Sequence, residues 1–428
     1  MQLSATKNNS QYLQGASAPC VSGGDEMKKI TAIILILVSL LVLCSSCSKK
    51  GSEEGEKTTI TIWHDKEDAV IEVIERYLSS LDGIEVVFEK KSSLTDSLKL
   101  VGNDRSAAPD MYFFAHDKIG VYAEMGILSP ITDFIGENEL SSHLPVTLDG
   151  GMYKEVRYQL PLYYETLLFI YNKKYMKESE IPSTTEELYS YMEKKTKYGH
   201  YGFVEQHSTP YYASCWLHGF GTDYISDDGT PLLDTEATQK ALEYHRKFVA
   251  LMPGETEYST INTLFLEGMA HSTIAGPWFI PSVTAKGIEV GVAAIPVVDE
   301  TGLPISPYCG IQGFHVLKVH AEEKKDAITA VLRALMNTDL QVELALLTGA
   351  APADGKAYEN ESVGSSELVM AMKETAGNAV SMPNIPEMDV MFSVAGSLLT
   401  DINMSGEDVS SACEKAQKKA LELIEAMK

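Results

Sequence analysis

Aromatic residues stand beside charged or polar residues at six places along the chain. Aromatic rings offer an apolar platform, tyrosine and tryptophan add a polar edge, and charged side chains make the stronger hydrogen bonds to hydroxyl groups. A sugar ring has a C–H face that packs on an aromatic ring and a rim of hydroxyls, so these residue types suit a carbohydrate ligand. The segments are 63–66, 114–118, 161–165, 209–212, 275–279 and 382–392.

The sequence carries no linear motif of a catalytic or cofactor site. It has no Walker A loop and no GxSxG, HExxH or GxGxxG motif, and its ten histidines are scattered without a paired metal-ligand spacing. We therefore expect no cofactor and no metal. Carboxylates are too numerous to select a glycosidase pair, so a secreted carbohydrate-active enzyme stays open as an alternative.

The charge balance argues against nucleic acid as a partner. The 428 residues carry 60 acidic and 35 basic side chains, a formal charge of −25, and such a field repels a phosphate backbone. The first 47 residues hold three lysines and two acidic residues, so the acidic excess belongs to the rest of the chain.

The first 47 residues are interpreted as a signal segment. Two lysines precede an apolar run at 30–43, which is too short for a comfortable membrane span and fits a secretory signal. An uncleaved anchor helix is the alternative. Residues 1–26 carry no periodic pattern and are consistent with an overextended start, with Met27 as the initiator.

The apolar run ends in Leu43-Cys44-Ser45-Ser46-Cys47, which resembles a bacterial lipobox. Cys47 is the predicted lipidation site because two serines precede it, and Cys44 stays open as the alternative. Residues 48–57 are polar and contain glycine, which predicts a flexible tether. We expect a globular body attached by a lipid to the extracellular face of the cell membrane.

Three cysteines remain beyond the lipobox, Cys215, Cys309 and Cys413, and none stands in a CxxC motif. Three thiols cannot all pair, and the sequence selects no disulfide. We expect buried free thiols.

The elements that must position the aromatic and charged residues begin with a β-α-β-α-β pattern. Strands are predicted at 58–63, 84–88 and 111–114, with helices at 70–81 and 94–101 between them. This order implies parallel strands joined by right-handed helical crossovers. Loops at the carboxyl ends of such strands line the ligand crevice, which is where the segments 63–66 and 114–118 fall.

The rest of the chain mixes single strands with helices. A helix start is predicted at Ser183, with Glu186 completing a capping box, and a hairpin turn at Asp228-Gly229. This order suits two α/β lobes that the chain visits more than once, with a hinge and a ligand cleft between them. Further strands are expected at 158–164, 167–171, 270–275, 290–295 and 313–319, and helices at 119–124, 236–251, 260–266, 322–336, 340–347, 388–402 and 407–427.

The ordered set of segments resembles the extracellular solute-binding proteins of ABC importers, most of all the maltose/maltodextrin-binding proteins. The resemblance runs from about Thr58 to Lys428. It implies an α/β, two-lobe periplasmic-binding-protein type II fold with a hinged inter-lobe cleft. The expected N-terminal lobe is 58–163 with 310–360, and the expected C-terminal lobe is 164–309 with 361–428. The matching segments are 109–110, 114–118, 120–126, 163–165 with 170–173, 276–278 and 382–386.

The resemblance also implies roles for charged residues. Asp117 and Lys118 stand where the family hydrogen-bonds sugar hydroxyls, although arginine is more familiar than lysine at the second position. Glu165 matches a carboxylate that accepts sugar hydroxyls. Asp65 and Lys66 match the acid–base pair after the first strand, in a loop two residues shorter.

The aromatic roles follow in the same way, with two departures elsewhere in the pattern. Tyr211, beside Tyr212, and Trp278 match aromatic platforms. Phe114 and Phe392 stand where the maltose binders carry tryptophan. Thr209 stands where a sugar-binding glutamate is expected, and Gly396 where an arginine is expected, so the subsites or the oligosaccharide differ. The predicted ligand-binding residues are Asp65, Lys66, Phe114, Asp117, Lys118, Glu165, Tyr211, Tyr212, Trp278 and Phe392.

Several of these residues also have a purely structural interpretation. Trp63 and Trp216 suit the hydrophobic core, and His116 suits a hydrogen-bonded structural role. Asp117 is placed to cap the following helix, and Glu165 is placed to pair with a lysine at the hinge.

The resemblance implies a monomeric, non-enzymatic receptor that delivers maltose/maltodextrin-type oligosaccharides to the transmembrane permease subunits of an ABC importer. Its membrane contact is the N-terminal lipid anchor. Another oligosaccharide, or another small solute, is the alternative ligand.

Overall fold

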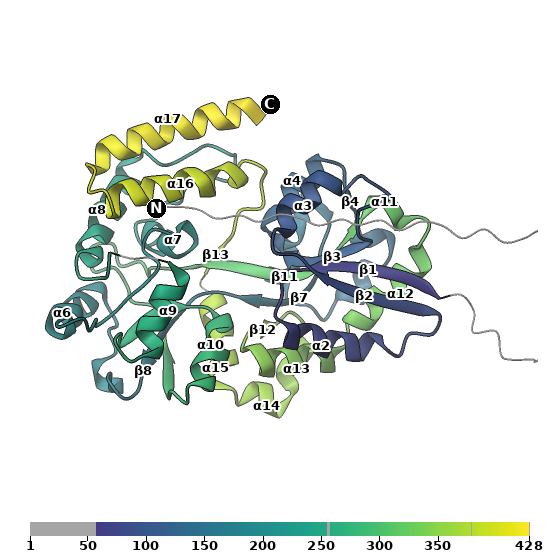
Figure 1. Ribbon diagram of the computed structural model, residues 1–428, viewed down its shortest axis with the longest axis horizontal. Coiled ribbons are helices and arrows are strands. Elements are labelled where there is room, and N and C mark those ends of the chain that lie inside the picture. The colour runs from purple at the N-terminus through teal and green to yellow at the C-terminus, as the bar shows by residue number, and fades with distance from the viewer. Residues whose placement is uncertain (1–56, 255–256, 378, 428) are drawn as a thin grey trace, which may run out of the picture. The chain divides into compact units, whose positions relative to one another are not determined.

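The computed structural model describes residues 57–254, 257–377 and 379–427 (Figure 1). The predicted signal segment, Cys44, Cys47 and nearly all of the tether lie outside the described residues. Within the described ranges, no helix combines the length and apolar character needed to cross a membrane.

The larger sheet has the strand order β12-β7-β11-β3-β1-β2. β1 pairs in parallel with both β2 and β3, and α2 and α3 are the intervening helices, which confirms the predicted β-α-β-α-β unit. β11 runs antiparallel to β3 and to β7. The bounds are β1 (Thr58–His64), α2 (Asp68–Leu78), β2 (Ile84–Lys90), α3 (Leu94–Val101), β3 (Met111–Ala115), β7 (Leu160–Glu165), β11 (Tyr308–Leu317) and β12 (Ala351–Pro352).

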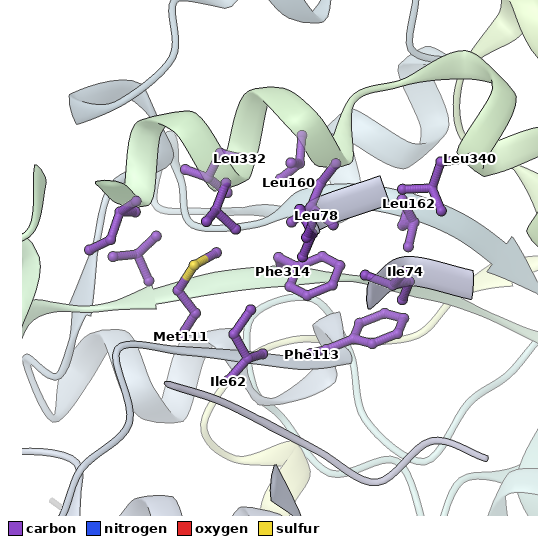
Figure 2. Close-up of a cluster of buried hydrophobic side chains, with 14 of the residues drawn as sticks. Ile62, Ile74, Leu78, Met111, Phe113, Leu160, Leu162, Phe314, Leu332 and Leu340 are labelled. Atoms are coloured by element: carbon purple, nitrogen blue, oxygen red, sulfur yellow. The ribbon is translucent and has the colours of Figure 1, made fainter. Parts of the chain in front are cut away.

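Alternating apolar residues of these strands form the core of this sheet. Phe113 on β3 stacks on Phe314 on β11, with ring centroids 4.5 Å apart. Figure 2 shows these rings among Ile62, Leu160 and other side chains that face the covering helices. The helices are α2, α12 (Lys325–Leu335) and α13 (Thr338–Thr348). Packing the helices on the strands removes apolar surface from water, which stabilises the fold by about 25 cal/mol per Å2.

A second sheet has the order β10-β8-β9, with both pairs antiparallel. Only Thr166 and Leu167 separate β7 of the first sheet from β8 of the second. Thr166 is buried, and its hydroxyl donates a 2.8 Å hydrogen bond to the carbonyl of Tyr308, so this short crossing is fixed to the start of β11. The bounds are β8 (Leu168–Asn172), β9 (Ser272–Ala275) and β10 (Val290–Ala293).

Helices supply most of the remaining structure, and α16 and α17 pack side by side (Figure 1). The helices not yet given are α4 (Ile119–Glu124), α5 (Pro145–Gly150), α6 (Thr185–Lys195), α7 (Pro210–His218), α8 (Glu236–Val249), α9 (Tyr258–Leu266), α10 (Ile280–Ala285), α11 (Lys318–Ala321), α14 (Glu361–Gly364), α15 (Glu367–Gly377), α16 (Met388–Asn403) and α17 (Val409–Met427). The short strands are β4 (Leu128–Ser129), β5 (Met152–Tyr153), β6 (Val156–Arg157) and β13 (Val380–Ser381).

Three expectations about these elements are corrected. The strand expected at 313–319 is β11 and begins at Tyr308. The helix expected at 322–336 is α12, which begins at Lys325, and the separate short helix α11 precedes it at the end of the strand expected at 313–319. The cap of α6 is Thr184, whose side chain accepts from the backbone N–H of Glu187. It is not Ser183, whose backbone N–H and hydroxyl instead donate to the Glu187 side chain.

The predicted turn at Asp228-Gly229 is confirmed. Gly229 adopts a φ of 81°, which a residue without Cβ adopts at no steric cost. Its N–H donates a 2.9 Å hydrogen bond to the carbonyl of Ser226.

Candidate ligand site

Three strands of the larger sheet end at the candidate site. β1 and β3 are parallel, and β7 runs in the same direction because β3 and β7 are both antiparallel to β11. Their carboxyl ends therefore lie at one edge of the sheet, where ligands bind in open α/β sheets. This topology gathers Asp65 and Lys66 after β1, the 116–118 turn after β3, and Glu165 at the end of β7.

Asp65 and Lys66 form an ion pair directly after β1. Lys66 Nζ lies 2.8 Å from Asp65 Oδ1, and the lysine side chain is 13% exposed against 37% for the aspartate. The same ammonium lies 5.2 Å from the ring centroid of Phe113 and 5.4 Å from that of Phe114. Cation–π attraction holds the Lys66 head group in place, while the Asp65 carboxylate stays open to solvent.

Glu165 interacts with both the charged and the aromatic parts of the site. Gln312 Nε2 on β11 donates a 2.8 Å hydrogen bond to Glu165 Oε1. Burial raises the pKa of the Glu165 carboxyl, while the Lys66 ammonium and the Gln312 bond oppose that rise. Burial and the Glu165 charge together raise the pKa of the Tyr211 hydroxyl. The hydrogen bond of Glu165 goes to a glutamine and not to a lysine at the hinge.

The aromatic part of the site comes from three separate elements. Tyr211 lies in the first turn of α7, Trp278 in the short 3-10 helix η5 (Pro277–Phe279) after β9, and Tyr308 at the start of β11. The Tyr211 ring centroid lies 6.3 Å from that of Trp278 and 6.4 Å from that of Tyr308. Tyr211 and Trp278 are half-buried and Tyr308 is fully buried. The two predicted platforms therefore lie together and keep part of their surface accessible.

Gly276 determines where the Trp278 indole lies. A Cβ at position 276 would lie 2.3 Å from two carbons of that ring, closer than any packed contact allows. The indole folds back over the glycine backbone because no side chain is in its way.

Tyr212 is buried, with 6% of its surface exposed. Its ring packs edge-on against Tyr211 at a centroid distance of 5.7 Å, and its hydroxyl lies near Trp278. Tyr212 therefore supports the two half-buried rings. As a ligand contact it stays a prediction.

Asp117 and Lys118 belong to the 3-10 helix η1 (His116–Lys118) that follows β3. Lys118 Nζ lies 3.4 Å from Asp117 Oδ2 and 3.0 Å from Asp389 Oδ1 on α16. Burial lowers the pKa of the Lys118 ammonium, but the two carboxylates outweigh burial and raise it. Asp117 caps neither η1 nor α4, so the capping interpretation is wrong and the carboxylate instead pairs with Lys118.

Phe114 and Phe392 are half-buried. Lys66 lies near the Phe114 ring and Lys118 lies 5.8 Å from the centroid of the Phe392 ring. Each predicted phenylalanine platform is thus paired with one of the two predicted lysines.

The two positions that lack an expected charge are neighbours in space. Thr209 directly precedes Pro210, and a Cβ on Gly396 would lie 3.7 Å from Pro210 Cγ. One corner of the site, at the start of α7, therefore lacks both charges.

The structural interpretations of three residues are confirmed. The backbone N–H of Ile311 donates to His116 Nδ1 at 3.1 Å, and His116 Nε2 lies 3.0 Å from the Met382 carbonyl. Trp216 is fully buried and Trp63 is 7% exposed, and both indole N–H groups donate to glutamates. The three cysteines are buried and free, as expected. Among the described residues, no group of three or more His, Cys, Asp and Glu side chains is arranged to hold a metal ion.

Sequence reasoning missed Gln312, Asp389 and Lys99. Gln312 contacts Glu165 from the neighbouring strand, and Lys99 and Asp389 extend the charges around Lys118. No local pattern marks these residues, because their partners lie far away in the sequence. Asp389 follows the 382–386 segment closely, and that position was its one available signal.

The chain belongs to the family of bacterial extracellular solute-binding proteins, whose model matches residues 72–371. It is 29% identical over 379 residues to the maltotriose-binding protein of Pyrococcus abyssi, covering 85% of this chain and 82% of that one. It is 25% identical over 426 residues to the galactooligosaccharide-binding protein of Bacillus subtilis, covering 94% and 99%. A maltooligosaccharide ABC transporter solute-binding lipoprotein of Streptococcus pneumoniae is 22% identical over 417 residues, covering 91% and 95%.

The fold is the two-lobe periplasmic-binding-protein fold. The maltose/maltodextrin-binding domain MalE of Bdellovibrio bacteriovorus, solved with maltotriose, superposes with a TM-score of 0.78. The match covers 86% of this chain and all of that one, at 24% sequence identity. The predicted α/β, two-lobe fold is therefore confirmed.

Proposed function

We propose that this protein is the receptor of an ABC sugar importer and captures maltose/maltodextrin-type oligosaccharides. One observation carries the proposal. The half-buried rings of Tyr211 and Trp278 lie together, and Tyr211 lies near Glu165, whose carboxyl is also affected by the charges of Asp65 and Lys66. The rings offer faces to the C–H side of a sugar, and the charged groups offer hydrogen bonds to its hydroxyls.

The site lies between two lobes in this proposal. The N-terminal lobe comprises 58–163 and 310–360, and the C-terminal lobe comprises 164–309 and 361–428. The first lobe holds Asp65, Lys66, Phe114 and the 116–118 turn, while the second holds the half-buried rings of Tyr211 and Trp278. A sugar that contacts both sets favours the closed arrangement, because a ligand shifts an equilibrium toward the state it binds better.

The cellular role follows from the N-terminal sequence and from the lipoprotein relative. Lipidation at Cys47 anchors the monomeric receptor to the extracellular face of the membrane, and 48–57 acts as its tether. The receptor delivers sugar to the permease subunits and catalyses no reaction. A secreted carbohydrate-active enzyme would release products from maltotriose, whereas this receptor leaves it intact over a long incubation.

A galactooligosaccharide is the second candidate ligand. The relative from Bacillus subtilis with that name matches nearly the whole chain, and the uncharged corner at Thr209 and Gly396 departs from the maltose-binding pattern. Both ligands use the same rings, so only direct binding separates them.

Tryptophan fluorescence and titration calorimetry test the proposal. The chain has three tryptophans, and Trp278 is the half-buried one, so maltotriose is expected to change the emission through Trp278. Trp278→Ala removes most of that change and Trp63→Phe, the control at a buried indole that is bonded to Glu89, retains it. Binding heat with galactooligosaccharides but none with maltodextrins would show that the ligand is a galactooligosaccharide, and the proposed receptor function would stand. No heat with either would overturn the sugar-binding proposal.

A further inference from the structure

We propose that Asp389 is a positioning residue that fixes the Lys118 ammonium for the ligand and joins the start of α16 to the 116–118 turn. The inference rests on the proposed function, because it concerns the same site. The sequence marks Asp389 only by its place after the 382–386 segment, and the observation that identifies its role is a chain of four alternating charges.

The four charges come from three elements. Lys99 Nζ on α3 donates to Asp389 Oδ2 at 2.5 Å, and Lys118 Nζ donates to Asp389 Oδ1 at 3.0 Å. Lys118 also lies 3.4 Å from Asp117. Each carboxylate oxygen of Asp389 therefore holds a different lysine, and the order is Lys99, Asp389, Lys118, Asp117.

Burial makes this chain stronger than an ordinary surface ion pair. The Lys118 and Asp117 side chains are 14% and 11% exposed, and that of Asp389 is 28% exposed. Exposed pairs contribute little because water and salt screen them, whereas partly buried pairs are screened much less. Burial raises the pKa of Asp389, but its bonds to Lys99 and Lys118 outweigh burial and lower it.

The backbone brings Asp389 to Lys118 at a fixed place. Gly120 donates its N–H to the carbonyl of Asn384 at 2.9 Å, and Asn384 Nδ2 donates to the Met152 carbonyl at 2.7 Å. A Cβ on Gly120 would lie 2.1 Å from the Asn384 carbonyl oxygen. The segment before α16 thus lies directly against α4, at a close approach that a side chain at position 120 would prevent. Asp389 then lies in the first helical turn, where a negative charge is favoured by the helix dipole.

Lys118 needs such a partner because its flexible side chain does not by itself fix the position of its ammonium group. A lysine is a point charge on a flexible four-carbon stem, without the planar fork of arginine. One of its three donors makes the hydrogen bond to Asp389, Asp117 lies 3.4 Å from its ammonium, and the Phe392 ring lies nearby. The bond to Asp389 orients the Lys118 ammonium, so that another of its N–H groups is oriented for a ligand hydroxyl before the ligand binds.

The test compares Asp389→Asn with Asp401→Asn. Asp401 lies on the same helix, its side chain is 30% exposed, and it pairs with Lys415 at 2.7 Å, so it is an ion-paired aspartate of similar exposure away from the site. Asp389→Asn is expected to weaken maltotriose binding about tenfold, the effect of losing one charged hydrogen bond at a fixed donor. Asp401→Asn leaves the affinity unchanged, and Asp389→Glu recovers part of it.

A double-mutant cycle separates positioning from general stability. Lys118→Met weakens binding by itself, and adding Asp389→Asn is expected to weaken it no further because Asp389 acts through Lys118. Additive losses of affinity would overturn the inference, as would wild-type affinity in Asp389→Asn, even with a lowered unfolding temperature. If the wild-type protein does not bind maltotriose, both the proposed ligand and this inference are overturned. That result differs from one in which the wild-type protein binds maltotriose and only the inference about Asp389 fails.

Discussion

At the residue scale, Glu165 is the carboxylate on which ligand contact most depends. Glu165→Gln should weaken maltotriose binding by roughly 1.5–3 kcal/mol, the range for a hydrogen bond to a charged group. Because burial raises the Glu165 pKa, ionising this carboxyl costs folding free energy above that pKa. The unfolding temperature should therefore stay equal or rise.

Calorimetry and thermal unfolding of Glu165→Gln check both expectations. Glu343→Gln is the control, because Glu343 pairs with Arg76 on the surface at 2.7 Å, away from the site. Unchanged affinity in Glu165→Gln would remove the carboxylate from the site.

Gly276→Ala tests the placement of the Trp278 ring. The added Cβ would lie 2.3 Å from the indole, so the ring must move, and binding should weaken severalfold, by about 1–2 kcal/mol from lost stacking and strain. Gly254→Ala is the control, because nothing lies within 4 Å of a Cβ there. Equal affinity in the two variants, measured by calorimetry, would show that the indole position does not matter.

At the element scale, the sequence predicted the elements with clear periodicity and missed those without it. The helices at 94–101 and 119–124 appear with the predicted bounds, and the parallel strands pair as expected. α7 was not predicted because nearly all its residues are buried, which leaves no polar face to reveal a helical repeat. β11 was started too late for a similar reason, since all ten of its residues are buried.

The contact between α7 and α8 depends on one buried carboxyl group. Trp216 on α7 and His245 on α8 both bond to Glu205 Oε1, at 2.9 Å and 2.6 Å, and Glu205 is fully buried. Glu205→Ala leaves both donors without an acceptor and should lower the free energy of unfolding by about 3–5 kcal/mol. Glu205→Gln, which retains an acceptor oxygen, should cost less. Urea denaturation checks the order, and equal effects of the two variants would contradict it.

At the scale of the whole molecule, buried histidines should make stability fall in acid. Burial lowers the pKa of His315 to about 3 and also lowers those of His116, His143 and His207. These histidines are neutral in the folded protein, and their unfolded pKa is about 6.5. Their contribution to the free energy of unfolding is therefore complete above pH 6.5. It is lost as the pH falls toward their pKa values in the folded protein.

His315 allows this effect to be isolated. Its ring stacks on Tyr112 at 4.2 Å, and neither ring nitrogen has a hydrogen-bond partner, so His315→Phe preserves the stacking. The free energy of unfolding from urea titrations should fall less steeply between pH 6 and pH 4 in His315→Phe, by up to about 1.4 kcal/mol per pH unit. Identical slopes would contradict the neutral, buried state of His315.

The assembled site also shows what a single sequence leaves out. The pairs that follow strands, Asp65 with Lys66 and Asp117 with Lys118, were predictable because strand ends define an edge. The bond of Gln312 to Glu165 and the bond of Asp389 to Lys118 join residues 147 and 271 positions apart. Such pairs depend on which strands are neighbours in the sheet and on where α16 packs, which no local pattern encodes.

Calorimetric titration of the wild-type protein with maltotriose, run beside a galactooligosaccharide, tests the central claim most directly. The account predicts saturable binding of maltotriose at one site per chain, weakened by Trp278→Ala and Glu165→Gln but not by Trp63→Phe. Absence of heat with both sugars, or binding that survives both site variants, would contradict it.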